Sequence, residues 1–123
     1  MFNNDEISQL EEAYTCGNCN FLAVEIARIY PNYEVVVNAL EHSTPQEYNH
    51  ALVRHVHTGE LLDITGVYNT EQKFRARTIF GEPGYSITTP DDTFTATPGD
   101  ETFDNVTVDQ AISYMLEQGW IDM

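Results

Sequence analysis

Two cysteines near the start of the chain are the residues best suited to covalent chemistry. They enclose the segment CGNC from Cys16 to Cys19, and an apolar run with helical spacing follows directly and stops before Pro31. This pattern predicts a buried helix over about residues 19–30, with Cys19 in its first turn. Unpaired backbone N–H groups and the positive end of the helix dipole lower the pKa of a thiol at that place. The same N–H groups can bind the oxyanion that forms when an acyl carbon becomes tetrahedral.

A histidine and an aspartate further along provide the other two groups that a thiol nucleophile needs. His50 opens a predicted strand that runs to residue 57, and Asp63 lies in a second predicted strand over residues 60–65. Thiol, imidazole and carboxylate thus follow one another along the chain in the order Cys, His, Asp. We expect His50 to act as general base and then as general acid, and Asp63 to hold the imidazole in the required tautomer.

The length of the turn between those strands decides whether the aspartate reaches the histidine. If Thr58-Gly59 is a two-residue turn, Asp63 faces Arg54 on the neighbouring strand. Asp63 is then four residues, or about 13 Å, from the level of His50, although both side chains point to the same face of the sheet. A bulge or a longer turn would bring Asp63 to His50. Otherwise Asp63 is simply a partner of Arg54.

Zinc binding is an alternative for the same residues. Cys16 and Cys19 supply half of a four-ligand site, and the four histidines are available for the rest: His42, His50, His55 and His57. Strand parity disfavours a shared site, because His50 points to one face of the sheet whereas His55 and His57 point to the other. A single pair of cysteines at this spacing is also frequent by chance. We therefore expect no metal.

Purely structural roles are a further alternative. Free cysteine is among the most buried residue types, so Cys19 in this interpretation is a small apolar residue at the start of a core helix. His50 is then a strand-end histidine whose ring nitrogens are hydrogen-bonded to neighbours. The reactivity of the thiol toward an electrophile distinguishes these roles from catalysis.

The motifs around these residues resemble those of the papain-like cysteine hydrolases, in the broad sense that includes compact papain-fold domains of bacterial toxins and effectors and transglutaminase-like proteins. The segment from Cys16 to Cys19 is similar to the papain-type Cys-Gly-Ser-Cys segment, and two further motifs follow it, His50-Ala51-Leu52-Val53 and Leu62-Asp63-Ile64-Thr65-Gly66. The resemblance covers about residues 15–67. It implies that Cys19 is the nucleophile, that His50 is the general base and that Asp63 orients the imidazole.

Two positions depart from the papain pattern. Ala13 stands six residues before Cys19, where papain-type enzymes have the glutamine of the oxyanion hole, and Asn20 replaces the aromatic residue that usually follows the nucleophile. The second oxyanion donor therefore has no assigned residue, and Asn18 and Asn20 are the candidates. The remainder of the chain, residues 67–123, carries no motif of the family.

The other predicted elements complete a scaffold for these groups. Five are expected: helices over about residues 7–15 and 107–118, strands over residues 33–37 and 85–88, and either a short helix or a strand over residues 69–77. Residues 85–105 are rich in Thr and Asp and predict a long loop or flap. The predicted fold is α+β and papain-like, with a helix that carries Cys19 at its start packed on a small antiparallel sheet. A C-terminal helix completes one domain over residues 1–123.

Composition sets the class of partner. The chain of 123 residues carries 20 Asp and Glu against 5 Lys and Arg, which gives a formal net charge of −15. DNA, RNA and anionic membranes are polyanions, so such a chain is not expected to bind them, and a basic peptide or protein surface is the expected partner. The sequence shows neither a signal-peptide pattern nor an apolar stretch of membrane-spanning length, which predicts a cytoplasmic protein.

These features together predict a papain-like thiol hydrolase or transferase that acts on an amide or acyl bond through an acyl-enzyme. The class includes proteases, amidases, deamidases and acyltransferases, and it needs no metal or organic cofactor. The alternative is a non-catalytic acidic protein, an inhibitor or nucleic-acid mimic that occupies a basic surface of its partner. Intact Cys19 and His50 favour the enzyme, whereas the charge of −15 on a small body favours the binding protein.

Overall fold

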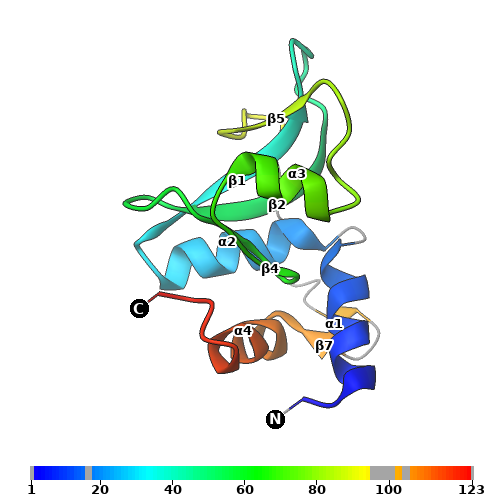
Figure 1. Cartoon of the computed structure of the whole chain (residues 1–123), viewed down its shortest axis with the longest axis vertical. Coiled ribbons are helices and arrows are strands. Elements are labelled where there is room, and N and C mark those ends of the chain that lie inside the picture. Colours follow the sequence, from blue (N-terminus) through cyan, green and yellow to red (C-terminus); the bar gives the residue numbers. More distant parts are fainter. Residues whose placement is uncertain (1, 16–17, 95–101, 104–105, 123) are drawn as a thin grey trace.

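A five-stranded antiparallel sheet with helices on both faces forms the body of the molecule (Figure 1). The computed structural model describes residues 2–15, 18–94, 102–103 and 106–122. Its helices are α1 (Asn4–Thr15), α2 (Cys19–Ile29), α3 (Glu71–Arg77) and α4 (Val108–Glu117). Its strands are β1 (Tyr33–Leu40), β2 (Tyr48–His55), β3 (Leu61–Asp63), β4 (Gly66–Tyr68), β5 (Tyr85–Thr88), β6 (Thr102–Phe103) and β7 (Val106–Thr107). The predicted α+β class is confirmed.

The strand order in the main sheet is β4-β3-β2-β1-β5. β1 pairs along almost all of β2, from Tyr33 opposite His55 to Ala39 opposite Tyr48. In contrast, β3 pairs with β2 only at two positions, opposite Val53 and Arg54. Among the described strands, none pairs with the first half of β2 on its β3 side, and the start of α2 meets the sheet at this gap.

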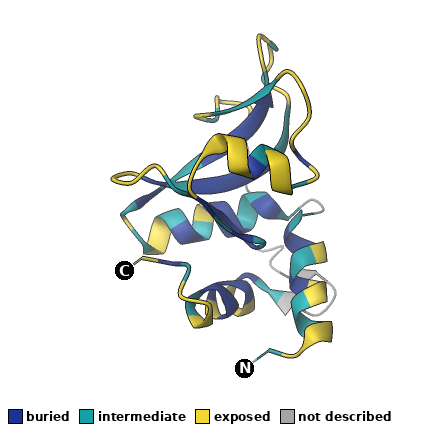
Figure 2. Ribbon diagram, viewed as in Figure 1, coloured by how far each residue is buried: buried dark blue, intermediate teal, exposed yellow. Residues whose placement is uncertain are grey.

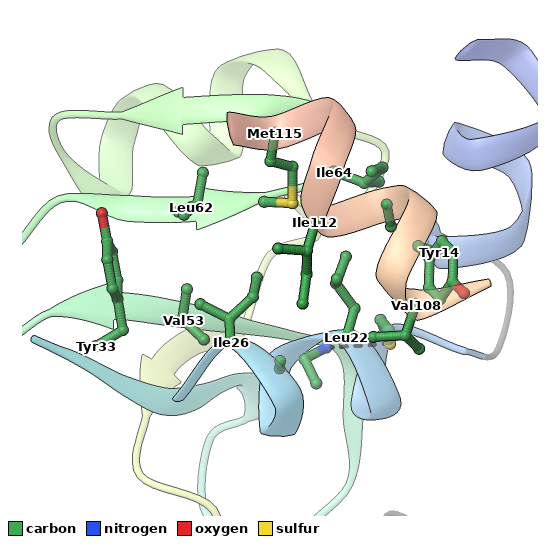
Figure 3. Close-up of a cluster of buried hydrophobic side chains, with 14 of the residues drawn as sticks. Tyr14, Leu22, Ile26, Tyr33, Val53, Leu62, Ile64, Val108, Ile112 and Met115 are labelled. Carbon is green, nitrogen blue, oxygen red and sulfur yellow. Dashed lines mark hydrogen bonds between the residues drawn. The ribbon is translucent and has the colours of Figure 1, made fainter. Parts of the chain in front are cut away.

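Two apolar layers form because successive strand residues point to opposite faces of the sheet. On β1, Val37 belongs to the larger cluster, which lies between the sheet and α1, α2 and α4, and Val36 belongs to the smaller cluster beneath α3. Figure 3 shows Leu22 and Ile26 of α2 meeting Ile112 of α4 within the larger cluster. Exposed residues lie along the outer faces of α1 and α3, in the loops and on parts of the other helices (Figure 2).

Side-chain caps fix the starts of the two helices that follow the sheet strands. The Thr107 hydroxyl accepts from the backbone N–H of Gln110, and the Gln110 side chain accepts from the N–H of Thr107, so the predicted capping box of α4 is confirmed. The Thr70 hydroxyl accepts from the N–H of Lys73 at the start of α3. Residues 71–77 are thus helical, and the strand interpretation of residues 69–77 is wrong.

The expected flap is described only in part. A strand at residues 85–88 is confirmed as β5, which pairs with β1 at the edge of the sheet. β6 and β7 form a small separate hairpin, whereas residues 95–101 and 104–105 lie outside the described part of the chain. Within the described residues, every helix is too short or too polar to cross a membrane.

Candidate active site

Cys19 is the first residue of α2 and lies against the part of β2 that does not pair with β3. Its side chain is buried, and the backbone N–H of Ala51 donates to Sγ at 3.4 Å. Sulfur thus accepts the hydrogen bond that a neighbouring strand would otherwise accept at this position of β2. This contact brings the helix start to the residue that directly follows His50.

His50 lies in the same part of β2 and pairs with Asp63 of β3. The imidazole is fully buried, and its Nε2 is 2.8 Å from Oδ2 of Asp63. Leu62 is opposite Val53 and Leu61 is opposite Arg54, so Asp63 lies at the level of Leu52, two positions from His50. Diagonal neighbours at this separation are within reach of each other on one face of a sheet.

The expected two-residue Thr58-Gly59 turn is wrong. The backbone N–H of Gly59 donates to the carbonyl of His55, and the N–H of His55 donates to the carbonyl of Glu60, so residues 56–59 form a four-residue loop. The longer loop shifts β3 by two residues along β2. Asp63 consequently meets His50, as expected for a longer turn.

Arg54 is therefore not the partner of Asp63. It faces Leu61 across the β2–β3 pair, and its guanidinium lies 3.3 Å from Oε1 of Glu34 on β1. This ion pair is partly exposed and separate from the His50–Asp63 pair.

The second oxygen of Asp63 is held by the next turn. Oδ1 accepts from the backbone N–H of Thr65 at 2.8 Å and from the Thr65 hydroxyl at 2.5 Å. The Tyr68 hydroxyl lies 2.8 Å from Oγ1 of Thr65 and donates to it, because the Thr65 proton is used on Asp63. The N–H and hydroxyl of Thr65, the latter supported by the Tyr68 hydroxyl, thus fix the Asp63 carboxylate, whose Oδ2 meets His50.

The electrostatics favour charged forms of both Cys19 and His50. Burial raises the pKa of the Cys19 thiol, but the nearby His50, together with the N–H groups of Ala51 and Asn20, outweighs this effect and lowers it below its ordinary value. Burial lowers the pKa of His50, and the contacts with Asp63 and Cys19 raise it more strongly, to about 9. Both shifts favour the charged forms, a thiolate on Cys19 and an imidazolium on His50.

The remaining ring nitrogen of His50 is the one available to the thiol. Nδ1 is buried, and no described residue offers it an aligned hydrogen-bond partner. Cys19 and His50 lie close enough to shift the pKa of each other. Catalytic hydrogen bonds are often long or poorly aligned before substrate binds, so this arrangement is compatible with proton transfer. The tautomer with hydrogen on Nε2, which donates to Asp63, leaves Nδ1 free to accept a proton from sulfur.

The two candidate oxyanion residues differ in their surroundings. The Asn20 side chain donates to the Tyr48 hydroxyl at 2.7 Å, and its Oδ1 lies 3.5 Å from Sγ of Cys19. Asn18 precedes α2 as its N-cap but makes no side-chain capping bond. The Asn20 amide nitrogen is thus already hydrogen-bonded, whereas Asn18 is not used to cap the helix.

The other histidines lie away from Cys19. His55 packs edge-on against Tyr33, and its Nε2 is 2.8 Å from Oδ2 of Asp122. His42 lies in an exposed turn after β1, and His57 lies in the loop after β2. The part of the chain that the structure describes contains no group of three or more His, Cys, Asp or Glu residues arranged to hold a metal ion. Cys16 is outside that part.

Sequence reasoning missed the aromatic ring that covers the imidazole. Phe80 follows α3, and its ring lies parallel to that of His50, with centroids 4.0 Å apart and an interplanar angle of 5°. Nothing in the local sequence indicates this contact, because the two residues are 30 positions apart on different elements. Thr65 was missed as well, although its position two residues after Asp63 is typical of a local side-chain turn.

Open space lies beside the Cys19–His50 pair rather than between the two residues. The cavity that touches Cys19 is about 10 Å³, room for at most one water molecule. A larger surface pocket of about 260 Å³ lies between the end of α1 and the end of α3, and its walls include Thr65 and Phe80. Those two residues also contact Asp63 and His50, so this pocket, named here the α1–α3 pocket, adjoins the buried site.

Comparison of the chain with protein-family models, curated proteins and solved structures gives no significant match.

Proposed function

We propose that the protein is a cysteine-dependent hydrolase or acyltransferase with a papain-like arrangement, acting on an amide or acyl bond. The observation that carries this proposal is a thiol at the start of a helix beside a buried histidine whose other nitrogen meets a fixed carboxylate. A helix that starts with the nucleophile and packs on an antiparallel sheet carrying His50 and Asp63 supports the papain-like assignment. No other cluster of described residues offers comparable chemistry.

The proposed reaction follows from the protonation states of the pair. The Cys19 thiolate attacks the acyl carbon, a C–S bond forms and the carbonyl oxygen becomes an oxyanion, which N–H groups at the start of α2 stabilise. His50 then gives its Nδ1 proton to the leaving amine, and the C–N bond breaks. Water or an amine then attacks the thioester and gives a proton to His50, and the C–S bond breaks to restore the Cys19 thiolate. Asp63 keeps the imidazole oriented throughout.

The substrate is proposed to be a peptide or protein with positive charge near the reacting group. Asp63 is the only Asp or Glu classed as buried in the described residues, so the other described carboxylates lie on or near the surface. A net charge of −15 attracts cations and increases the rate of encounter with a basic substrate. We place this activity in the cytoplasm, where free thiols stay reduced.

The proposal is tested by acylation with a thioester of a short lysine-containing peptide, followed by intact mass measurement. The protein carries Cys16→Ser, so that Cys19 is the only thiol. We expect a mass increase on Cys19 that is absent from Cys19→Ala and at least about a hundredfold slower in His50→Ala. His55→Ala is the matched control, because His55 also pairs with an aspartate at 2.8 Å but lies away from Cys19.

An unchanged acylation rate in His50→Ala, or equal losses in His50→Ala and His55→Ala, would contradict the proposal.

The second candidate function is an acidic binding protein, and the surface position of its carboxylates favours it. In that case Cys19→Ala binds a basic protein as tightly as the wild type does, and the affinity falls steeply with salt. Calorimetry at two salt concentrations measures this difference.

A further inference from the structure

Asn38 is a buried polar residue at a position where the sheet does not require a polar side chain. It lies in the middle of β1, opposite His50 on β2, and is fully buried. Its Oδ1 has no hydrogen-bond partner in the described residues. Because burying an unpaired polar oxygen is unfavourable, an apolar residue would stabilise the sheet better at this position. The use of an asparagine here points to the role of its amide nitrogen.

That nitrogen binds the loop after α3. Nδ2 of Asn38 donates to the carbonyl of Phe80 at 2.7 Å and to Oδ1 of Asn49 at 2.9 Å. Nδ2 of Asn49 donates to the same Phe80 carbonyl at 3.2 Å. Two amides from adjacent strands thus converge on one carbonyl, which also accepts from the N–H of Glu82 at 2.9 Å. We name this group of Asn38, Asn49 and the Phe80 carbonyl the amide clamp.

A β-bulge makes the contact between the Asn49 side chain and the Phe80 carbonyl possible. Asn38 pairs with His50, but the next residue of β1, Ala39, pairs with Tyr48, so Asn49 is the extra residue on β2. In a regular strand, Asn49 and His50 would point to opposite faces of the sheet. The bulge turns the Asn49 side chain toward the face that carries His50, and bulges next to active sites commonly re-aim a side chain in this way.

The backbone after Phe80 is also held in place by close packing. A Cβ atom at Gly81 would lie 2.0 Å from the carbonyl oxygen of Arg75 in α3. Only glycine allows this approach, so the loop is pressed against the helix on one side and bonded to the sheet on the other. Phe80 is consequently fixed in both position and direction, with its ring 4.0 Å from His50.

The Phe80 ring affects the imidazole in two ways. Stacking restricts rotation of the ring of His50, so that Nε2 stays on Asp63 while Nδ1 stays available. The π face of an aromatic ring attracts a cation, which favours the imidazolium over the neutral form. The titratable groups that shift the pKa of His50 are Cys19 from α2 and Asp63 from β3. The residues that β1, α3 and the following loop place opposite or against its ring are uncharged: Asn38, Phe74 and Phe80.

We propose that Asn38 and Asn49 are positioning residues of the active site that act through Phe80. They hold its ring against His50 and thereby favour the orientation and the charge that the imidazole needs to activate Cys19. This inference rests on the proposed function, since it describes how the general base is prepared.

The test compares Asn49→Ala, Phe80→Leu, Phe80→Tyr and the double variant Asn49→Ala/Phe80→Leu, all with Cys16→Ser. Asn49 is changed rather than Asn38 because it is only partly buried and the variant is expected to fold. The measurements are the alkylation rate of Cys19 by iodoacetamide against pH, the NMR titration of the His50 ring, and the unfolding temperature.

We expect Phe80→Leu to slow alkylation at neutral pH by about two- to fivefold and to make His50 titrate at lower pH, because the cation–π attraction is lost. Phe80→Tyr keeps the aromatic face and retains the wild-type rate. Asn49→Ala slows alkylation in the same direction, and the double variant is no slower than Phe80→Leu alone, because both changes act on one contact.

The proposal is overturned if Asn49→Ala changes only the unfolding temperature, or if the effects of the two single variants multiply in the double variant. If the wild-type thiol reacts fast and depends on His50 but the pH profiles of the variants are unchanged, the role of the amide clamp is rejected and the proposed function stands. A wild-type thiol of ordinary reactivity that does not depend on His50 rejects both.

Discussion

At Cys19, burial and a charged neighbour act on the thiol in opposite directions. Burial disfavours the thiolate, while the His50 imidazolium and the N–H groups of Ala51 and Asn20 favour it, and the net effect is a lowered pKa. The helix start alone does not explain this result, since the contact with His50 is the larger favourable influence. The sequence predicted both residues but not the balance between them, because burial depends on packing between distant elements.

Asp63→Asn tests whether the carboxylate orients the imidazole. The amide loses the charge that raises the pKa of His50, so we expect at least about a tenfold slower acylation of Cys19. Asp122→Asn is the matched control, since it alters the corresponding pair with His55 and should leave the rate unchanged. Stopped-flow or quenched acylation assays measure both rates. Equal rates in Asp63→Asn and the wild type would remove Asp63 from the mechanism.

The histidine also predicts how stability depends on pH once the thiol no longer titrates. In Cys19→Ser, burial still lowers the pKa of His50 and the contact with Asp63 still raises it, and we expect Asp63 to keep the folded pKa above the ordinary value of about 6.5. A raised folded pKa stabilises the protein fully below about pH 6.5, and this contribution is lost as pH rises through the folded pKa. Urea titrations between pH 6 and 9 should show a falling free energy of unfolding, and Asp63→Asn should abolish this fall.

At the scale of elements, the sequence predicted those helix starts that depend on a few neighbouring residues. The start of α2 at Cys19 and the capping box at Thr107 followed from residue types within one turn of each helix. The β2–β3 register did not, because four residues join these strands where Thr58-Gly59 suggested two. β4 was missed because its three residues are too short to show alternation. The stacking of Phe80 on His50 depends on three elements and leaves no local signal.

Gly81 offers a prediction about the loop that carries Phe80. In Gly81→Ala the added Cβ overlaps the Arg75 carbonyl, so the loop must move away from α3 and carry Phe80 with it. We expect a lower unfolding temperature together with slower alkylation of Cys19. Gly59→Ala is the control, because its φ of 77° also disfavours alanine, yet nothing lies within 4 Å of the added atom and the loop is remote from Cys19. It should lower stability without changing the alkylation rate.

If Gly81→Ala is destabilised but alkylates at the wild-type rate, the position of Phe80 does not influence the thiol.

At the scale of the whole molecule, the net charge of −15 opposes the thiolate that the site stabilises. Thiolate formation therefore depends on short-range contacts with His50 and on buried N–H groups, which salt screens only weakly. The long-range field acts instead on charged molecules that approach the site, because it repels anions and attracts cations. Salt is therefore expected to change the rate at which a charged reagent reaches the site while leaving the thiolate itself almost unaffected.

The charge of the reagent separates these two effects. Anionic iodoacetate should alkylate Cys19 more slowly than neutral iodoacetamide at low ionic strength, relative to the ratio for a free thiol, because the surface field repels it. The difference should shrink as salt rises to about 0.5 M, where the screening length is only a few ångströms. Parallel rate measurements with the two reagents check this expectation. A ratio that does not change with salt would show that the surface charge has no effect at the site.

The pH dependence of Cys19 alkylation, measured in Cys16→Ser with and without His50→Ala, tests the central claim most directly. We expect the rate with His50 present to reach its plateau below the ordinary titration range of a thiol and to remain high at neutral pH. In His50→Ala the midpoint should move above that range, because burial then acts on Cys19 without the imidazolium. A midpoint that stays in the same place after His50→Ala would contradict the thiolate–imidazolium pair and the proposed function with it.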